Sequence, residues 1–158
     1  MATETKADAP PVDDSVPKDV ETCLADFFKN NVLHDISLTN PNTKAEIVKA
    51  HKAILASGST YFLEVFRTNP KDADGKETLT YIEVPKPVKT ASQTSATVTD
   101  DHVLRIMKYI YNNQNFDCIK EGINDTNMSA IYAQAYVMKC KNLLKALDDM
   151  IVNVLLKP

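Results

Sequence analysis

The sequence predicts an α+β fold in which a small three-stranded sheet packs with a cluster of helices. Three observations predict this class. Short segments with strand-like alternation lie at residues 34–40 and 45–50, and a third β-rich segment lies at 79–84. Longer segments with apolar residues at helical spacing precede, separate and follow them. Strands and helices in this unequal order are typical of α+β proteins, and 158 residues are enough for one domain with a core.

The first element is a helix over residues 18–31, preceded by a tail at 1–17 that we expect to be disordered. The tail holds Asp, Pro, Ala and Lys with almost nothing to bury. At the start of the helix, Pro17 suits a first helical turn and Asp19 suits the positive end of the helix dipole. Its apolar residues recur at helical spacing and form a wide stripe, consisting of Val20, Leu24, Phe27 and Phe28.

A β-hairpin follows, with "HDISLTN" and "AEIVKA" as its strands and the turn residues "NPNT" between them. Two short helices come next. Gly58 interrupts the helical pattern between them, and Ser59 is suited to cap the second helix, "TYFLEVF". The third strand is "LTYIEV", which is rich in residues that favour strands.

The second half of the chain is predicted to be mainly helical. A Pro-, Ser- and Thr-rich insertion at about 86–97 is expected to be flexible, and Thr99 is expected to cap the helix that follows. The segment "NFDCI" is interpreted as a short edge strand. The remaining residues predict two consecutive helices with a hinge near "KCKN".

Composition excludes several classes of function. The net charge is −3 and Arg67 and Arg105 are the only arginines, so we expect no nucleic-acid partner. No apolar stretch is long enough to cross a bilayer, so we expect no membrane partner. Three cysteines without a C-x-x-C pair indicate neither a metal site nor a dithiol motif, and suggest reduced thiols in a cytoplasmic or nuclear protein. Three glycines allow no nucleotide-binding fingerprint, so we expect no cofactor.

The residues that could support catalysis lack partners in the sequence. His51 is expected to be a hydrogen-bonded junction residue between strand and helix. His34 and Asp35 are neighbours on a strand and point to opposite faces, and Ser57 and Ser59 lack the G-x-S-x-G pattern. His102 lies in a helix's first turn, which favours capping over a metal site. The helical tyrosines are expected to pack in the core, namely Tyr61, Tyr109, Tyr111, Tyr132 and Tyr136.

Several segments together resemble the BTB/POZ domain family, over roughly residues 18–156. The resemblance is carried by the segments "HDISL", "VKAHKAILASGSTYFLEVF", "VTDDHVLRIMKYIYNN" and "AYVMKCKNLLKALDDMI". It implies a BTB/POZ domain at 18–156 and a dimer interface on the first helix at Val20, Leu24, Phe27 and Phe28. It also implies a charged pocket of Asp35 and Lys52, for which an ordinary ion pair or hydrogen-bonded cap is an equal alternative.

The resemblance further suggests a surface that could face a cullin, comprising Phe62, Phe66, Pro70 and Asp72. The nearest match to the family's hydrophobic-x-acidic triplet is Pro70-Lys71-Asp72, and proline is a poor anchor, so we expect weak cullin binding at best. The sequence thus predicts a protein–protein interaction module without catalysis, forming a homodimer and acting as a scaffold. The alternatives are a substrate adaptor of a cullin-type ubiquitin ligase, which binds a cullin or another BTB protein, and an enzyme that uses His51.

Overall fold

The computed structural model describes residues 20–30, 32–68, 74, 79–87 and 98–155, with side chains from Leu24 to Asn153. Two expectations therefore fall outside it: the disordered tail at 1–17, and the flexible insertion from residue 88 onward. Within the described residues the fold consists of seven helices and one three-stranded sheet, which confirms the predicted α+β class.

The sheet is formed by β1 (Ile36–Thr39), β2 (Glu46–Ala50) and β3 (Tyr81–Glu83), in the order β2-β1-β3. β1 and β2 are antiparallel, as the hairpin predicts, whereas β3 runs parallel to β1. The register pairs Ile36 with Ala50 and Leu38 with both Val48 and Ile82. These apolar side chains therefore share one face of the sheet, and that face covers the core.

The first half of the chain contributes three helices, α1 (Val20–Asn30), α2 (Lys52–Gly58) and α3 (Thr60–Thr68). Ser59 caps α3 as predicted, since its Oγ accepts a hydrogen bond from the backbone N of Phe62 at 3.3 Å. Gly58 ends α2 where it crosses α4. A Cβ there would lie 2.7 Å from Cγ1 of Ile110, so this close approach requires glycine.

The second half contributes α4 (Asp100–Tyr111), α5 (Asp117–Lys120), α6 (Met128–Val137) and α7 (Lys141–Leu155). Thr99 caps α4 as predicted, accepting a hydrogen bond from His102 N at 3.4 Å. The segment "NFDCI", by contrast, is not a strand. Asn115 Oδ1 accepts a hydrogen bond from Asp117 N at 3.0 Å and turns the chain into α5, whose Ile119 is buried.

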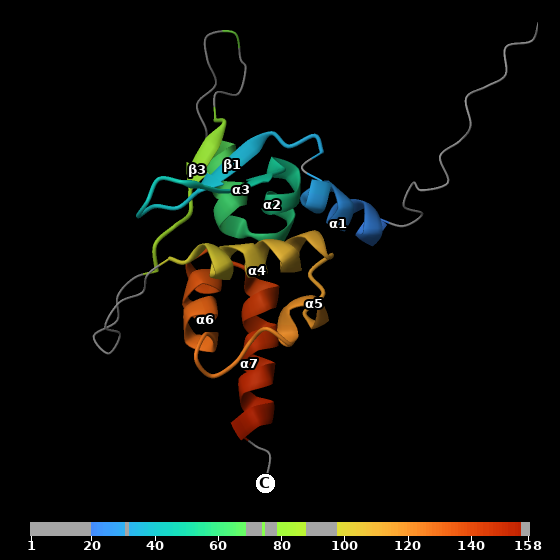
Figure 1. The fold of residues 1–158 in the computed structure, drawn as a ribbon, viewed down its shortest axis with the longest axis vertical. Coiled ribbons are helices and arrows are strands. Elements are labelled where there is room, and N and C mark those ends of the chain that lie inside the picture. Colours follow the sequence, from blue (N-terminus) through green and yellow to red (C-terminus); the bar gives the residue numbers. More distant parts are fainter. Residues whose placement is uncertain (1–19, 31, 69–73, 75–78, 88–97, 156–158) are drawn as a thin grey trace, which may run out of the picture.

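Helix α4 is the centre of the molecule. It lies between a layer of the sheet with α2 and α3 and a second layer of α6 and α7 (Figure 1). Six of its twelve residues are buried, including Ile106, Met107 and Tyr111. Helix α1 packs near the C-terminal end of α4, on the same side as α2, whereas α6 and α7 extend away on the other side. The α1 surface and the α6–α7 surface are therefore separate.

Candidate interaction surfaces

Helix α1 is attached to the domain by its phenylalanines. The ring of Phe28 lies 4.6 Å from the ring of Tyr111 on α4, and it packs against the core. The ring of Phe27 lies 5.9 Å from that of His51 and remains half-buried. Of the four residues predicted for a dimer interface, Phe28 thus also has an intrachain role, and the side chain of Val20 lies outside the description.

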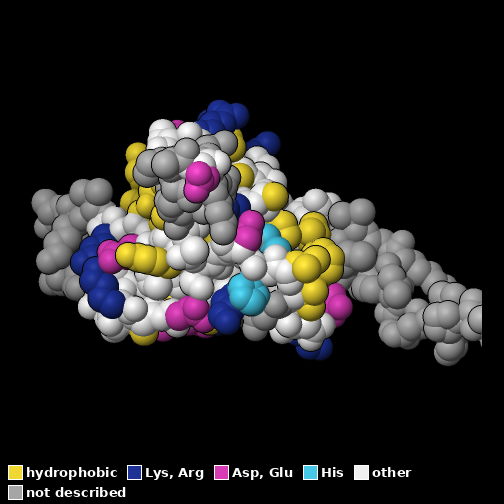
Figure 2. All heavy atoms as spheres, turned by 90° about the horizontal axis from the view of Figure 1, so that it is seen from above, with side chains coloured by type: hydrophobic (Ala, Val, Ile, Leu, Met, Phe, Trp, Pro, Cys, Tyr) yellow, Lys and Arg dark blue, Asp and Glu magenta, His cyan; other side chains and the backbone are white. Residues whose placement is uncertain are grey.

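An apolar surface, here called the α1 strip, is formed by Leu24, Phe27, Val32 and Leu33. Leu24 and Phe27 are half-buried, Val32 is 42% exposed and Leu33 is 79% exposed. Figure 2 shows hydrophobic side chains gathered on the side where α1 lies, next to a histidine. Leu33 also has φ 57°, a left-handed backbone conformation that is costly for a leucine. The residues after α1 were not singled out from the sequence, although "NVL" directly extends the apolar stripe.

His51 connects this surface to the core. Its Nε2 lies 2.6 Å from Val32 O, and its Nδ1 and backbone N both lie 2.8 Å from Tyr111 Oη. A carbonyl oxygen can only accept, so Nε2 is the donor to Val32 O, and in the tautomer with the proton on Nε2 the other ring nitrogen, Nδ1, accepts from the Tyr111 hydroxyl. This is the hydrogen-bonded junction expected from the sequence, and it leaves neither ring nitrogen available as a base in this conformation.

The other candidates for chemistry also have structural contacts. Ser57 Oγ donates to Ile54 O, and Ser59 Oγ donates to Met138 O. His102 is half-buried, and burial lowers its pKa against the opposing effect of the Asp101 carboxylate. Among the residues that the structure describes, no group of three or more His, Cys, Asp or Glu side chains could hold a metal ion. In the same part of the chain, no helix is long and apolar enough to span a bilayer.

Asp35 and Lys52, predicted as a charged pocket, are joined in the structure by a hydrogen bond to the backbone. Asp35 Oδ1 accepts a hydrogen bond from the backbone N of Lys52 at 2.8 Å, at the start of α2. Asp35 is exposed and Lys52 is half-buried. The observed bond is the helix cap that the sequence allowed as an alternative. A pocket at a dimer interface remains a prediction.

The surface expected to face a cullin is only partly accessible. Phe62 is fully buried, and its ring lies 6.0 Å from that of Phe66, so Phe62 belongs to the core and cannot contact a partner in this conformation. Phe66 is half-buried, and Pro70 and Asp72 lie outside the described residues.

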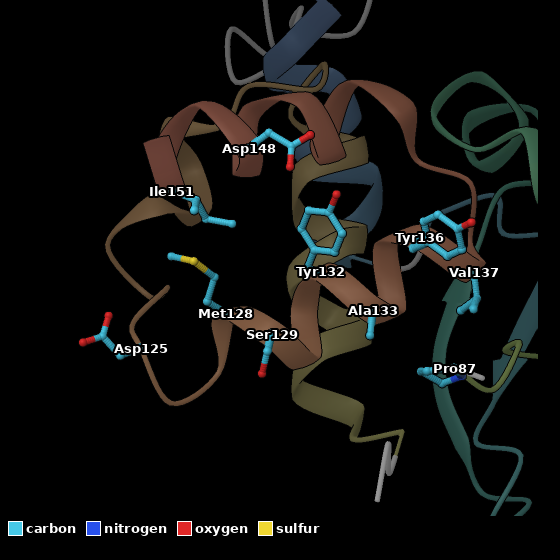
Figure 3. A pocket seen from close by; sticks show the side chains of 10 residues that line it. All are labelled: Pro87, Asp125, Met128, Ser129, Tyr132, Ala133, Tyr136, Val137, Asp148 and Ile151. Atoms are coloured by element: carbon cyan, nitrogen blue, oxygen red, sulfur yellow. The ribbon is translucent and has the colours of Figure 1, made fainter. Parts of the chain in front are cut away.

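A second apolar surface, here called the α6–α7 groove, was not predicted. It is a hollow of about 670 Å³ between α6, α7 and the segment at Pro87. Figure 3 shows Met128 and Ile151 facing each other across it, with Tyr132 directed toward Asp148. Gln134 is buried on α6 and donates a hydrogen bond to Pro85 O at 3.0 Å, which fixes the Pro87 end.

The tyrosines of α6 correct one expectation. Tyr136 was expected in the core but is 67% exposed, and Tyr132 is half-buried at the groove. Tyr109 and Tyr111 are buried as expected, and Tyr61 packs against the core. Helix α6, "MSAIYAQAYV", is apolar on all sides, and such helices are usually covered on all sides. Because the described structure does not cover every side of α6, this pattern in the sequence was the signal that an apolar face of α6 is left exposed.

The comparisons with known proteins agree with this architecture. A family model of the BTB/POZ domain matches residues 24–155. Among solved structures, the BTB domain of zebrafish PATZ1 superposes with a TM-score of 0.59 at 15% sequence identity, covering 84% of this chain and 88% of that chain. No curated protein sequence matches the chain.

The family match defines a protein–protein interaction module, since this is the general role of BTB domains, which are not typically enzymes. This chain belongs to the BTB/POZ domain family, as its sequence resemblance predicted.

Proposed function

We propose that this chain is a non-catalytic scaffold that works as a homodimer, with the α1 strip at the contact between the two copies. The observation that carries the proposal is Leu33, which is 79% exposed and has φ 57°. Within one chain this leucine has an unfavourable backbone conformation and buries little apolar area. A symmetric partner strip would bury it together with Val32 and Phe27.

The attachment of α1 supports a preorganised interface. The ring of Phe28 packs against that of Tyr111, and His51 donates a hydrogen bond to Val32 O, so the strip is anchored to the core on both sides. A rigid apolar surface loses little conformational entropy on association, which favours binding. Self-association also fits the family, whose members associate with themselves and with other proteins.

Light scattering on the full chain tests the proposal. At roughly tens of micromolar, the wild type should have twice the chain mass of 17.6 kDa. Leu33→Asp should give a monomer, because dimer formation would bury an unpaired carboxylate. Leu33 is exposed and aspartate tolerates a positive φ, so this variant should fold normally.

Val152→Asp is the control, since Val152 is also an exposed apolar residue, at 49%, and lies on α7 away from the α1 strip. It should stay dimeric. A monomeric wild type contradicts the proposal, and so does a Leu33→Asp variant that dimerises as well as the control.

The alternative function is a substrate adaptor of a cullin-type ligase. It is tested by titrating the chain against the N-terminal region of the host's own cullin. A low-nanomolar dissociation constant that is lost on substitution of the exposed Arg67 and Thr68 at the end of α3 would favour the adaptor over the scaffold.

A further inference from the structure

The α6–α7 groove has the properties of a docking site and lies apart from the α1 strip. Its volume of about 670 Å³ is within the range of protein binding pockets. Met128 and Ile151 form an apolar floor, and Tyr132 and Tyr136 present large rings beside it (Figure 3). Tyrosine is one of the residue types enriched among those that contribute most to binding at protein interfaces, and Tyr136 is exposed.

The groove's charge indicates the kind of partner. Asp125, before α6, and Asp148, on α7, line it and are both exposed. Asp148 also accepts a hydrogen bond from the Tyr132 hydroxyl, and this bond raises the pKa of Tyr132. No lysine or arginine is found among the described residues that line the groove. Among the described residues that line the groove, the apolar floor is thus bordered by the carboxylates of Asp125 and Asp148 and by no positive charge, which favours a partner with positive charge beside an apolar stripe.

Its shape favours a helix. The groove lies between two helices, α6 and α7, and is lined by residues at helical spacing, Met128, Tyr132 and Tyr136. An amphipathic helix places apolar side chains at i, i+3, i+4 and i+7 on one face, which suits such a groove. We propose that the α6–α7 groove binds an amphipathic helix of a partner protein, with an apolar face bordered by lysine or arginine.

This inference goes beyond the proposed homodimer, because the groove and the α1 strip are on different sides of α4 (Figure 1). If the chain dimerises through α1, each dimer carries two grooves. Two linked partner helices would then bind more tightly than one through the higher effective concentration.

The experiment selects peptides of about 16 residues, long enough to form a helix in a groove, from a displayed helical library on the full-length chain. The apolar positions and their flanking positions are randomised. The expected peptides have an apolar i, i+3, i+4, i+7 stripe flanked by Lys or Arg. Their dissociation constants are then measured by fluorescence polarisation on the chain and its variants.

Two pairs of variants assign the binding site. Tyr136→Ala should weaken binding about tenfold or more, whereas Tyr81→Ala, at an equally exposed tyrosine on β3, should change it less than about twofold. Asp148→Asn keeps the hydrogen-bond acceptor but removes the charge, and should weaken binding more than Asp149→Asn on the same helix.

Three results would overturn the inference: no enriched helical peptide, peptides with acidic flanks, or equal effects of Tyr136→Ala and Tyr81→Ala. A Tyr136→Ala variant with half the wild-type mass in light scattering would also overturn it, because the groove would then bind a second copy of the chain. Peptide binding that persists in a monomeric Leu33→Asp variant separates this site from the dimer contact.

Discussion

Replacement of Ser59 by alanine should destabilise the domain more than its place in the polar "SGS" segment suggests. Ser59 is 2% exposed, and its hydroxyl has two roles. As the cap of α3 it accepts a hydrogen bond from Phe62 N, and it donates one to Met138 O at the turn between α6 and α7. One hydroxyl thus joins the start of α3 to the end of α6, through two residues that are 79 positions apart in sequence.

The magnitude follows from these two contacts. Loss of a serine N-cap costs about 1 kcal/mol. Met138 is fully buried, and among the described residues its carbonyl accepts from Ser59 Oγ and, at a long 3.7 Å, from Cys140 Sγ. Leaving such an acceptor without a good partner costs about 1–3 kcal/mol. Because the two contacts share one atom they do not add fully, and we expect a loss of about 2–3 kcal/mol.

The assay is urea unfolding followed by circular dichroism, supported by thermal unfolding, where the midpoint should fall by about 5–10 °C. Ser57→Ala is the matched control. Ser57 is exposed and its hydroxyl only donates to Ile54 O within its own helix, so its replacement should change stability by less than about 0.5 kcal/mol. Equal effects of the two substitutions would refute the assignment of Ser59 as a link between α3 and the α6–α7 turn.

Three further predictions concern the junction between α2 and α4 and the core. Tyr111→Phe should cost about 1–2 kcal/mol in urea unfolding, because it removes the partner of the backbone N and Nδ1 of His51, while Tyr81→Phe at an exposed site should cost nothing measurable. Gly58→Ala should destabilise by about 1–3 kcal/mol, since its Cβ would meet Ile110 at 2.7 Å, and a stabilised Gly58→Ala variant in thermal unfolding would contradict this packing. Burial raises the pKa of Cys140 to about 12 from 9.0 and that of Tyr111 to about 12 from 10.0. The unfolded chain therefore releases these protons first, so the stability present below pH 9 should fall as the pH rises to about 12. A urea midpoint that stays constant from pH 8 to 11 would show that these groups titrate normally.

The sequence by itself determined most of the local elements and the class of the protein. Alternating apolar residues in β1 and β2 specified the hairpin, and Ser59 and Thr99 marked helix starts by residue type alone. These features depend on interactions between residues that are close in sequence, so the sequence alone is enough to predict them. The same segments carried the family resemblance, which the family match confirmed.

The tertiary structure decided which apolar side chains are exposed. Phe62 and Phe66 lie on one stripe of α3, yet Phe62 is fully buried and Phe66 only partly, because the packing of distant elements sets their depth. The segment "NFDCI" is too short for the spacing of its apolar residues to distinguish a strand from a helix. In the structure, the hydrogen bond from Asp117 N to Asn115 Oδ1 starts helix α5 there. Helix α6 is apolar on every side, so its sequence has no preferred face. Only the position of α7 and Pro87 leaves Tyr136 exposed and forms the groove.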